Sequence, residues 1–256
     1  MTSCLPLIAS ADSLSMAFNL DDPIVSLTLY TFAAATVAMG AGAAYFALML
    51  FRGDLDSENF TAITVSALVC GIACVNYHWM TQVYQASRGD FPTAVRYVDW
   101  VLTTPLLLLL FPLLLGMWQE SKWVFGTLIG LDLAMIGLGF AAEVMLNSGL
   151  PWVRWAPFFL LSCGCELAIV GVLFVSLSRA MDEAPADLAA GLRVLRLFVL
   201  IGWAVYPIGF LLSLGGGGDV RELIYNVADV VNKVGFGLVV HSGIAAVTSG
   251  PGWGRR

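Results

Sequence analysis

The sequence predicts an all-α membrane protein, a bundle of seven transmembrane helices. Of its 256 residues, 59% are hydrophobic and only 12% are charged, which is typical of a polytopic membrane protein and excludes an ordinary soluble domain. A helix needs about 20 mostly apolar residues to cross a bilayer. Seven segments meet this requirement, with short connections that leave no room for a second domain: about 23–51, 58–84, 91–116, 123–147, 151–178, 187–214 and 219–247.

The basic residues predict which way the bundle faces. Placed outside these segments, they divide into a larger group on one side (Arg52, Lys122, Arg179, Arg193, Arg196, Arg255 and Arg256) and a smaller group on the other (Arg88, Arg154 and Arg221). Cytoplasmic loops carry the excess of Lys and Arg. We therefore expect an extracellular segment 1–22 (a cleaved signal or an ordered cap), a helical domain 23–247, and a short cytoplasmic tail 248–256, in the inner or plasma membrane of the cell.

Metal and nucleic-acid functions find no support in the sequence. Its five cysteines make no metal-ligand spacing and imply no disulfide framework. We expect no metal site, no nucleic-acid partner and no enzymatic activity.

A lysine inside the last segment is the first candidate functional residue. Lys233 is one of two lysines in the chain, and a charge near the middle of a membrane helix costs about 2.5–3.5 kcal/mol on insertion scales. Asp229 lies one helical turn earlier on the same face, so each residue lowers the cost of the other's charge. Lysine is also the residue that forms a Schiff base with a carbonyl group. From these residues alone, a structural ion pair and a covalent attachment site both remain open.

The third segment carries a second polar stripe. Arg96, Asp99 and Thr103 are three and four residues apart, which places them on one face of an otherwise apolar helix. Leu110 returns to that face three turns later. A proton that moves along the stripe toward the cytoplasm would therefore meet a leucine.

Other polar residues in the predicted spans have two interpretations each. His78 near the end of the second segment is either a proton-linked group or an interfacial residue, and Asn76 lies beside it. His241 lies two turns beyond Lys233. Asp132 and Glu166 fall at mid-span, where a carboxyl without a basic partner is expected to keep its proton and either join helices or take part in transport.

Aromatic residues share one face of the sixth segment. Trp203, Tyr206 and Phe210 have helical spacing, and Pro207 should kink this helix. Considered alone, such a face is ordinary core.

Three motifs together resemble those of the microbial (type 1) rhodopsins, most closely the proteorhodopsin-like proton pumps. They are Arg-Tyr-x-Asp-Trp-x-x-Thr-x-Pro from Arg96, Trp-x-x-Tyr-Pro from Trp203, and Asp-x-x-x-Lys from Asp229. Each motif is weak alone, but their order and spacing over seven segments make the resemblance specific.

The resemblance implies a cofactor and a role for each matching residue. Lys233 would carry all-trans retinal as a protonated Schiff base, Asp99 would be the counterion and proton acceptor, and Asp229 the second counterion. Arg96 would balance these carboxylates, and Thr103 would belong to the same charge network. The matching retinal-pocket positions are Trp100, Thr104, Leu107, Met135, Gly139, Trp203, Tyr206, Pro207 and Phe210. Asp132 and Glu166 would lie near the ring end of the retinal.

The chain also departs from this family's pattern. The proton-donor carboxylate of the pumps falls at Leu110, so reprotonation must come from water, His241 or another group, and should be slow. The histidine that contacts the counterion in proteorhodopsins falls at Asn76, with His78 about 200° around the helix. Phe159 takes the place of the glycine of carotenoid-binding relatives, so no antenna pigment is expected. Leu107 implies green absorption.

The leading functional hypothesis is a light-driven outward proton pump. Asp99 argues against a chloride pump, the helix-three residues differ from those of sodium pumps, and Asp229 argues against an inward pump. The alternative is a sensory rhodopsin with a separate transducer, which the missing donor at Leu110 favours. A transporter or receptor without a chromophore remains a third interpretation. Expected partners are the lipid bilayer, protons and further copies of the chain, as a trimer to hexamer.

Overall fold

The computed structural model describes residues 22–51, 55, 57–87, 91–115, 122–175 and 178–248. Seven of its helical segments are long and apolar enough to cross a membrane: Pro23–Leu50, Asn59–Ser87, Thr93–Leu114, Lys122–Asn147, Trp152–Val175, Ala186–Ser213 and Gly218–Gly243. The predicted seven-helix bundle is confirmed, with boundaries within a few residues of those expected. Except for Asp22 and Thr248, the predicted N-terminal segment and C-terminal tail lie outside the described residues.

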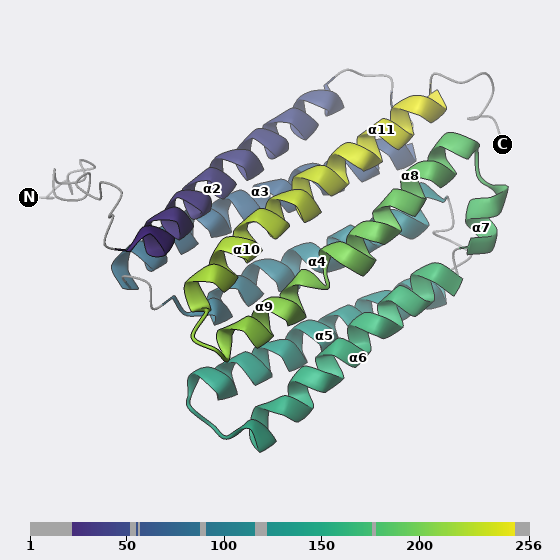
Figure 1. Cartoon of the computed structure of the whole chain (residues 1–256). Coiled ribbons are helices and arrows are strands. Elements are labelled where there is room, and N and C mark those ends of the chain that lie inside the picture. Colours follow the sequence, from purple (N-terminus) through teal and green to yellow (C-terminus); the bar gives the residue numbers. More distant parts are fainter. Residues whose placement is uncertain are drawn as a thin grey trace, which may run out of the picture.

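The helices lie side by side as one elongated bundle (Figure 1). In chain order they are α2 (Pro23–Leu50), α3 (Ser57–Ser87), the short η1 (Thr93–Val95), α4 (Arg96–Leu114), α5 (Lys122–Asn147), α6 (Trp152–Val175), α7 (Ser178–Glu183), α8 (Ala186–Leu197), η2 (Phe198–Gly202), α9 (Val205–Ser213), α10 (Gly218–Val230), η3 (Val231–Gly235) and α11 (Phe236–Thr248). The connection expected between the fifth and sixth predicted segments contains the short helix α7.

Local sequence explains where several helices begin and end. Asp22 caps α2 by accepting a hydrogen bond of 3.2 Å from the Val25 amide, and Pro23 follows at the first helical position. After α5, the Leu150 amide reaches back to the Met145 carbonyl at 3.1 Å, and Gly149 between them has a φ of 70°. This is a Schellman ending, which needs a residue that tolerates left-handed backbone.

The sixth span is interrupted just before Pro207, where a kink was predicted. Proline has no amide hydrogen, and its ring crowds the carbonyl four residues earlier. Here the Tyr206 amide donates to the Trp203 carbonyl at 2.9 Å, and π-helical η2 ends at Gly202. The Gly202 carbonyl is thereby released, and the Asn232 side-chain amide donates to it at 2.9 Å. The interruption thus ties the sixth span to η3, which contains Lys233.

A glycine allows the sixth and seventh spans to approach closely. A Cβ atom at Gly209 would lie 2.2 Å from the Tyr225 ring, so only glycine leaves room for this ring. The Tyr225 hydroxyl donates to the Tyr206 carbonyl at 2.5 Å. These contacts fix α9 against α10 beside the aromatic face that the sequence predicted.

Several basic residues lie inside helices rather than in the loops where they were placed. Lys122, Arg154, Arg193, Arg196 and Arg221 all belong to helices, and the side chains of Arg196 and Arg221 are buried. Arg52, Arg88, Arg255 and Arg256 lie outside the described residues, as does the Arg179 side chain. The placement used to orient the bundle is therefore wrong for these five residues, and the orientation itself stays a prediction.

Candidate functional site

A buried lysine lies between two carboxylates at the centre of the bundle. Lys233 Nζ on η3 is 2.6 Å from Asp99 Oδ2 on α4 and 3.0 Å from Asp229 Oδ2 on α10. The exposed fraction is 3% for Lys233 and 0% for each aspartate, so water screens these charges little. The structure thus brings together the residues that the sequence assigned to the Schiff base and its counterions. One ammonium group thus faces two carboxyl groups.

The two carboxylates differ in how they are held. Asp229 also accepts hydrogen bonds from Tyr77 (2.8 Å), Tyr206 and the Trp100 indole (3.3 Å). Asp99 has one side-chain partner, Lys233, and its Oδ1 has none among the described residues. Thr103 donates to the Asp99 backbone carbonyl (2.9 Å) instead of the carboxylate. Hydrogen bonds from neutral donors stabilise a carboxylate charge. Asp99 is therefore the carboxylate with a free oxygen for a proton.

Arg96 is paired with a residue that sequence reasoning missed. Its Nε donates to Glu222 at 2.7 Å, and no contact joins it directly to Asp99 or Asp229 in the described part of the chain. Arg96 instead reaches Asp229 through the Tyr77 hydroxyl, which accepts from Arg96 Nη1 at 2.9 Å and donates to Asp229. The expected charge balance is thus indirect.

Beyond Glu222, the ion pairs continue to the end of the bundle. Arg221 lies 3.0 Å from Glu222 and 3.0 Å from Glu143 on α5, and Thr93 donates to Glu222 at 2.5 Å. Asn226 accepts from Arg96 at 2.5 Å. We call these linked residues the charged network: Tyr77, Thr93, Arg96, Glu143, Arg221, Glu222 and Asn226.

Part of this network could have been predicted from helical spacing in the sequence. Glu222 and Asn226 lie seven and three residues before Asp229, which places them on the same helical face. Tyr77 lies between the two polar residues that were singled out in the second segment. The partner of Arg221 could not be identified this way, because Glu143 lies on a different helix, 78 residues away.

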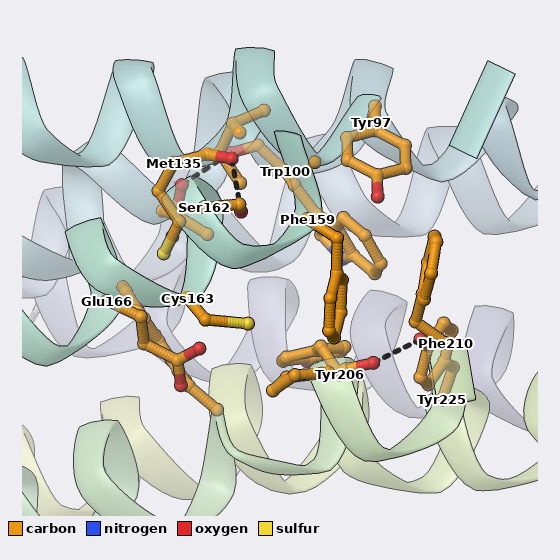
Figure 2. A pocket seen from close by; sticks show the side chains of 15 residues that line it. Tyr97, Trp100, Met135, Phe159, Ser162, Cys163, Glu166, Tyr206, Phe210 and Tyr225 are labelled. Atoms are coloured by element: carbon orange, nitrogen blue, oxygen red, sulfur yellow. Dashed lines mark hydrogen bonds between the residues drawn. The ribbon is translucent and has the colours of Figure 1, made fainter. Parts of the chain in front are cut away.

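An aromatic pocket begins beside Asp229. The pocket is lined by Tyr97, Trp100, Thr104, Met135, Ile136, Gly139, Phe159, Ser162, Cys163, Glu166, Trp203, Tyr206, Pro207, Phe210 and Tyr225 (Figure 2). Trp100 and Tyr206 both hydrogen-bond Asp229, and their ring centroids are 4.8 Å apart. All the predicted pocket residues line it except Leu107, which is buried in the same hydrophobic cluster as Trp100 and Trp203.

This lining fits an extended apolar cofactor attached to Lys233. Most wall residues are aromatic or aliphatic, and Tyr206 and Trp100 connect the wall to Asp229 by hydrogen bonds. Near Lys233, the unpaired Asp99 Oδ1 leaves one acceptor free. The pocket therefore suits a hydrocarbon chain, while the lysine and its carboxylates suit a positively charged attachment point.

Asp132 is buried against this wall without lining it. Thr104 Oγ1 lies 2.8 Å from the Trp100 carbonyl oxygen and 3.0 Å from Asp132 Oδ2. A threonine hydroxyl carries a single proton, so both hydrogen bonds form together only if Asp132 donates one. The geometry fits the predicted protonated carboxyl that joins helices.

Three polar residues singled out in the sequence lie away from this site. Asn76 donates to the Ile72 carbonyl of its own helix at 3.0 Å, and the exposed His78 lies 3.0 Å from Gln82. His241 is partly exposed and contacts Tyr45 at 3.2 Å, a residue with 38% of its surface exposed. None of the three contacts Asp99, Asp229 or Lys233 in the described part of the chain.

The opposite half of the bundle is apolar around Leu110. This residue has 0% exposure and belongs to a hydrophobic cluster with Phe46, Phe111 and Phe236, all of them equally buried. The Ser66 hydroxyl is buried here as well, but donates to the Ala62 carbonyl of its own helix at 3.0 Å. We call the cluster of Phe46, Leu110, Phe111, Phe236 and Val240 the apolar layer.

Known proteins resemble this chain over most of its length. Residues 26–247 match the family described as bacteriorhodopsin-like protein. The chain is 32% identical over 212 residues to the blue-light absorbing proteorhodopsin of Gamma-proteobacterium Hot 75m4, which covers 80% of this chain and 81% of that protein. It is 32% identical over 219 residues to the bacteriorhodopsin of Halobacterium salinarum, covering 80% and 79%.

A solved structure extends the likeness to the fold. The crystal structure of Exiguobacterium sibiricum rhodopsin superimposes with a TM-score of 0.79 at 38% sequence identity, covering 87% of this chain and 97% of that one. The resemblance that the three motifs indicated is confirmed. The protein is a member of the bacteriorhodopsin-like family of seven-helix membrane proteins.

Proposed function

We propose that this protein is a light-driven outward proton pump in which Lys233 holds the chromophore and Asp99 accepts the proton. The observation that carries the proposal is the buried triad of Lys233, Asp99 and Asp229, in which Asp99 alone keeps a carboxylate oxygen without a partner in the described structure.

All-trans retinal, attached as a Schiff base, is the cofactor of this family, and the family comprises retinal-binding light-driven ion pumps such as bacteriorhodopsin and proteorhodopsin. Xanthorhodopsin, whose solved structure is 27% identical in sequence to this chain, is a light-driven ion pump with dual chromophore. When bound, retinal supplies light absorption and a change of shape at the lysine nitrogen.

The chain's own residues supply the rest of the mechanism. Asp99 and Asp229 stabilise a positive charge at the Lys233 nitrogen, which burial would otherwise disfavour. Asp99 Oδ1 can take a proton without losing any hydrogen bond, whereas Asp229 is stabilised as an anion by three neutral donors. The aromatic wall, including Trp100 and Trp203, excludes water, so the proton has few competing acceptors.

The charged network connects the carboxylates near Lys233 to the end of the bundle, so a proton that reaches Asp99 can affect groups farther along it. Tyr77 connects Asp229 to Arg96, and Arg96 is paired with Glu222. A proton on Asp99 removes one of the two negative charges beside Lys233. The other, on Asp229, is joined to Arg96 through Tyr77, so the balance between Arg96 and Glu222 changes. Release would then occur at the network's end. The direction is outward if the bundle has the predicted orientation.

Reprotonation is the step that we expect to be slow. Leu110 and its phenylalanine neighbours separate Lys233 from the other end of the bundle. Since His241 lies at the surface against Tyr45, water that enters transiently is the more direct proton source.

The test is a suspension of cells that express the protein with all-trans retinal, illuminated in unbuffered salt while external pH is recorded. We expect acidification that a protonophore abolishes, and no visible pigment in a Lys233→Ala variant. Alkalinisation abolished by the protonophore would reverse the proposed direction. A pigment without any pH change would favour a sensory rhodopsin, for which the apolar layer would prolong the signalling state.

A further inference from the structure

Glu166 is the acidic residue that lines the pocket, among those described by the structure. It projects from α6 and is partly buried, and Figure 2 shows its carboxyl group next to Cys163, at the opposite end of the view from Tyr225. Within the described ranges, no side chain or backbone group hydrogen-bonds or ion-pairs with this carboxyl. The proposed mechanism gives it no role.

The surrounding wall offers Glu166 no polar partner. Ser162, one turn earlier on α6, donates its hydroxyl proton to the Met135 carbonyl at 2.7 Å. Cys163 is a weak hydrogen-bond donor, and the Trp203 indole, which also lines the pocket, has no hydrogen bond to Glu166 in the described structure. A carboxyl that faces a pocket at mid-span without a polar partner is costly. The position is therefore better explained by a polar group on the molecule that fills the pocket.

Asp132 provides a contrast within the same region. It too is a buried carboxyl at mid-span, but its Oδ2 is already bonded to Thr104 at 3.0 Å, and it does not line the pocket. Asp132 therefore serves the contact between α4 and α5, while the Glu166 carboxyl stays available to a ligand.

The pocket leads from the lysine's partners to Glu166. Trp100 and Tyr206, which hydrogen-bond Asp229, form one part of the pocket wall. Residues of α6 form another part, and in Figure 1 α9 lies between α10 and α6. A ligand that is attached to Lys233 and fills this space therefore meets α6 at its far end. The far end of plain retinal is a hydrocarbon ring, which offers Glu166 no hydrogen bond.

We propose that the pocket selects a retinal whose ring carries a hydroxyl group, and that Glu166 accepts the hydrogen bond from this hydroxyl. The inference rests on the proposed attachment of retinal at Lys233, and it names a narrower ligand class for the same site. Sites that hydrogen-bond a ligand hydroxyl disfavour the analogue that lacks it, because a polar group of the protein is then left unpaired.

Competition between two chromophores tests the proposal. The full-length protein, expressed without retinal, is incubated with equal amounts of all-trans retinal and all-trans 3-hydroxyretinal, and the bound chromophore is extracted and quantified by chromatography. We expect the wild type to be enriched about fivefold in the hydroxylated form, the size of effect of one hydrogen bond. Glu166→Leu should bind both equally, whereas Glu166→Gln, whose amide can still accept, should keep part of the preference.

Two controls separate this hydrogen bond from effects of shape. Cys165→Ala changes the residue before Glu166 on α6, which does not line the pocket, and should keep the wild-type ratio. A 3-methylretinal carries a substituent of similar size that can neither donate nor accept a hydrogen bond, so the wild type should show no preference for it over retinal, a result that needs no variant to fold.

The outcomes distinguish the two proposals. Equal binding of retinal and 3-hydroxyretinal by the wild type, or the same ratio in wild type and Glu166→Leu, would overturn the role of Glu166 and leave the pump intact. Failure of both chromophores to give a visible pigment would instead overturn the attachment at Lys233.

Discussion

On one side of Lys233, hydrogen bonds and ion pairs join buried charged groups from Asp229 to Glu143, whereas on the other side Leu110 lies in a cluster of phenylalanine side chains. The two halves are similarly buried but differ in chemistry. In the charged network each group has a polar neighbour within hydrogen-bond distance. In the apolar layer the five side chains that define it carry no polar group. A proton near Lys233 would therefore meet hydrogen-bonded polar groups on one side and apolar side chains on the other.

The largest expected effect on the pumping rate comes from replacing Asp99, the proposed proton acceptor between the charged network and the apolar layer. Asp99→Asn should lower the initial rate of light-driven acidification by a factor of about 10²–10⁴, because the amide cannot take a proton from the lysine nitrogen. The measurement is the rate of pH change per unit of visible pigment.

Asp132→Asn is the matched control for Asp99→Asn. It alters another fully buried aspartate that has no contact with Lys233 in the described structure, and should keep most of the rate. If Asp99→Asn pumps as fast as Asp132→Asn, another group accepts the proton, and the unpaired oxygen of Asp99 has no functional meaning.

The charged network should also stabilise the fold. Glu222→Gln removes the negative charge between Arg96 and Arg221, and both arginines are buried. Loss of one partner of a buried ion pair leaves an uncompensated charge and costs about 3 kcal/mol. We expect a lower free energy of unfolding in detergent and a lower midpoint of thermal bleaching.

Asp182→Asn offers a comparison at an exposed carboxylate on α7, and its stability should remain close to that of the wild type. Equal stability of the Glu222→Gln variant and the wild type would mean that the network is hydrated and only weakly coupled to folding.

The sequence predicts the features of these two halves that depend on residues close together in the chain, and not those that depend on contacts between helices. The spans were predictable because a membrane helix needs a local run of apolar residues, and Asp229 with Lys233 because one helical turn separates them. Leu110 was placed by the same periodicity. Glu143 and Arg221 could not be paired, because their contact depends on how α5 packs against α10.

The interruptions of the last two spans show the same limit. Pro207 predicts a kink, but the register of η2 and the bond from Asn232 to the Gly202 carbonyl depend on both spans together. Helical spacing alone likewise could not rank the two aspartates, whose roles came from the family resemblance, since the donors that favour Asp229 come from α3, α4 and α9. In physical terms, contacts within one helix are encoded locally and contacts between helices are not.

A carboxyl group introduced into the apolar layer should supply the proton donor that this half of the bundle lacks. Leu110→Glu places a proton donor on the helical face of Asp99, three turns away, and should speed the return of the ground state after a flash at least about tenfold. In the wild type, with water as the source, the rate should fall as pH rises, whereas in Leu110→Glu it should depend less on pH.

Leu110→Gln separates proton donation from hydration, because glutamine is polar and similar in size but carries no titratable proton. It should give less acceleration than Leu110→Glu and keep the pH dependence of the wild type. Equal acceleration by both variants would mean that water penetration, rather than a missing donor, limits the wild type.

The smallest effect is expected at His241, the one titratable side chain that sequence reasoning offered as a substitute donor. Its ring contacts Tyr45 on the outer face, and the buried Phe46 and Val240 belong to the layer between that face and the interior. His241→Ala should therefore leave the flash-induced return of the ground state within about twofold of the wild type between pH 5 and 8, the range over which histidine ordinarily changes charge. A marked slowing, absent from Tyr45→Phe, would show that protons cross the apolar layer from its lateral edge and that the layer is less closed than its burial implies.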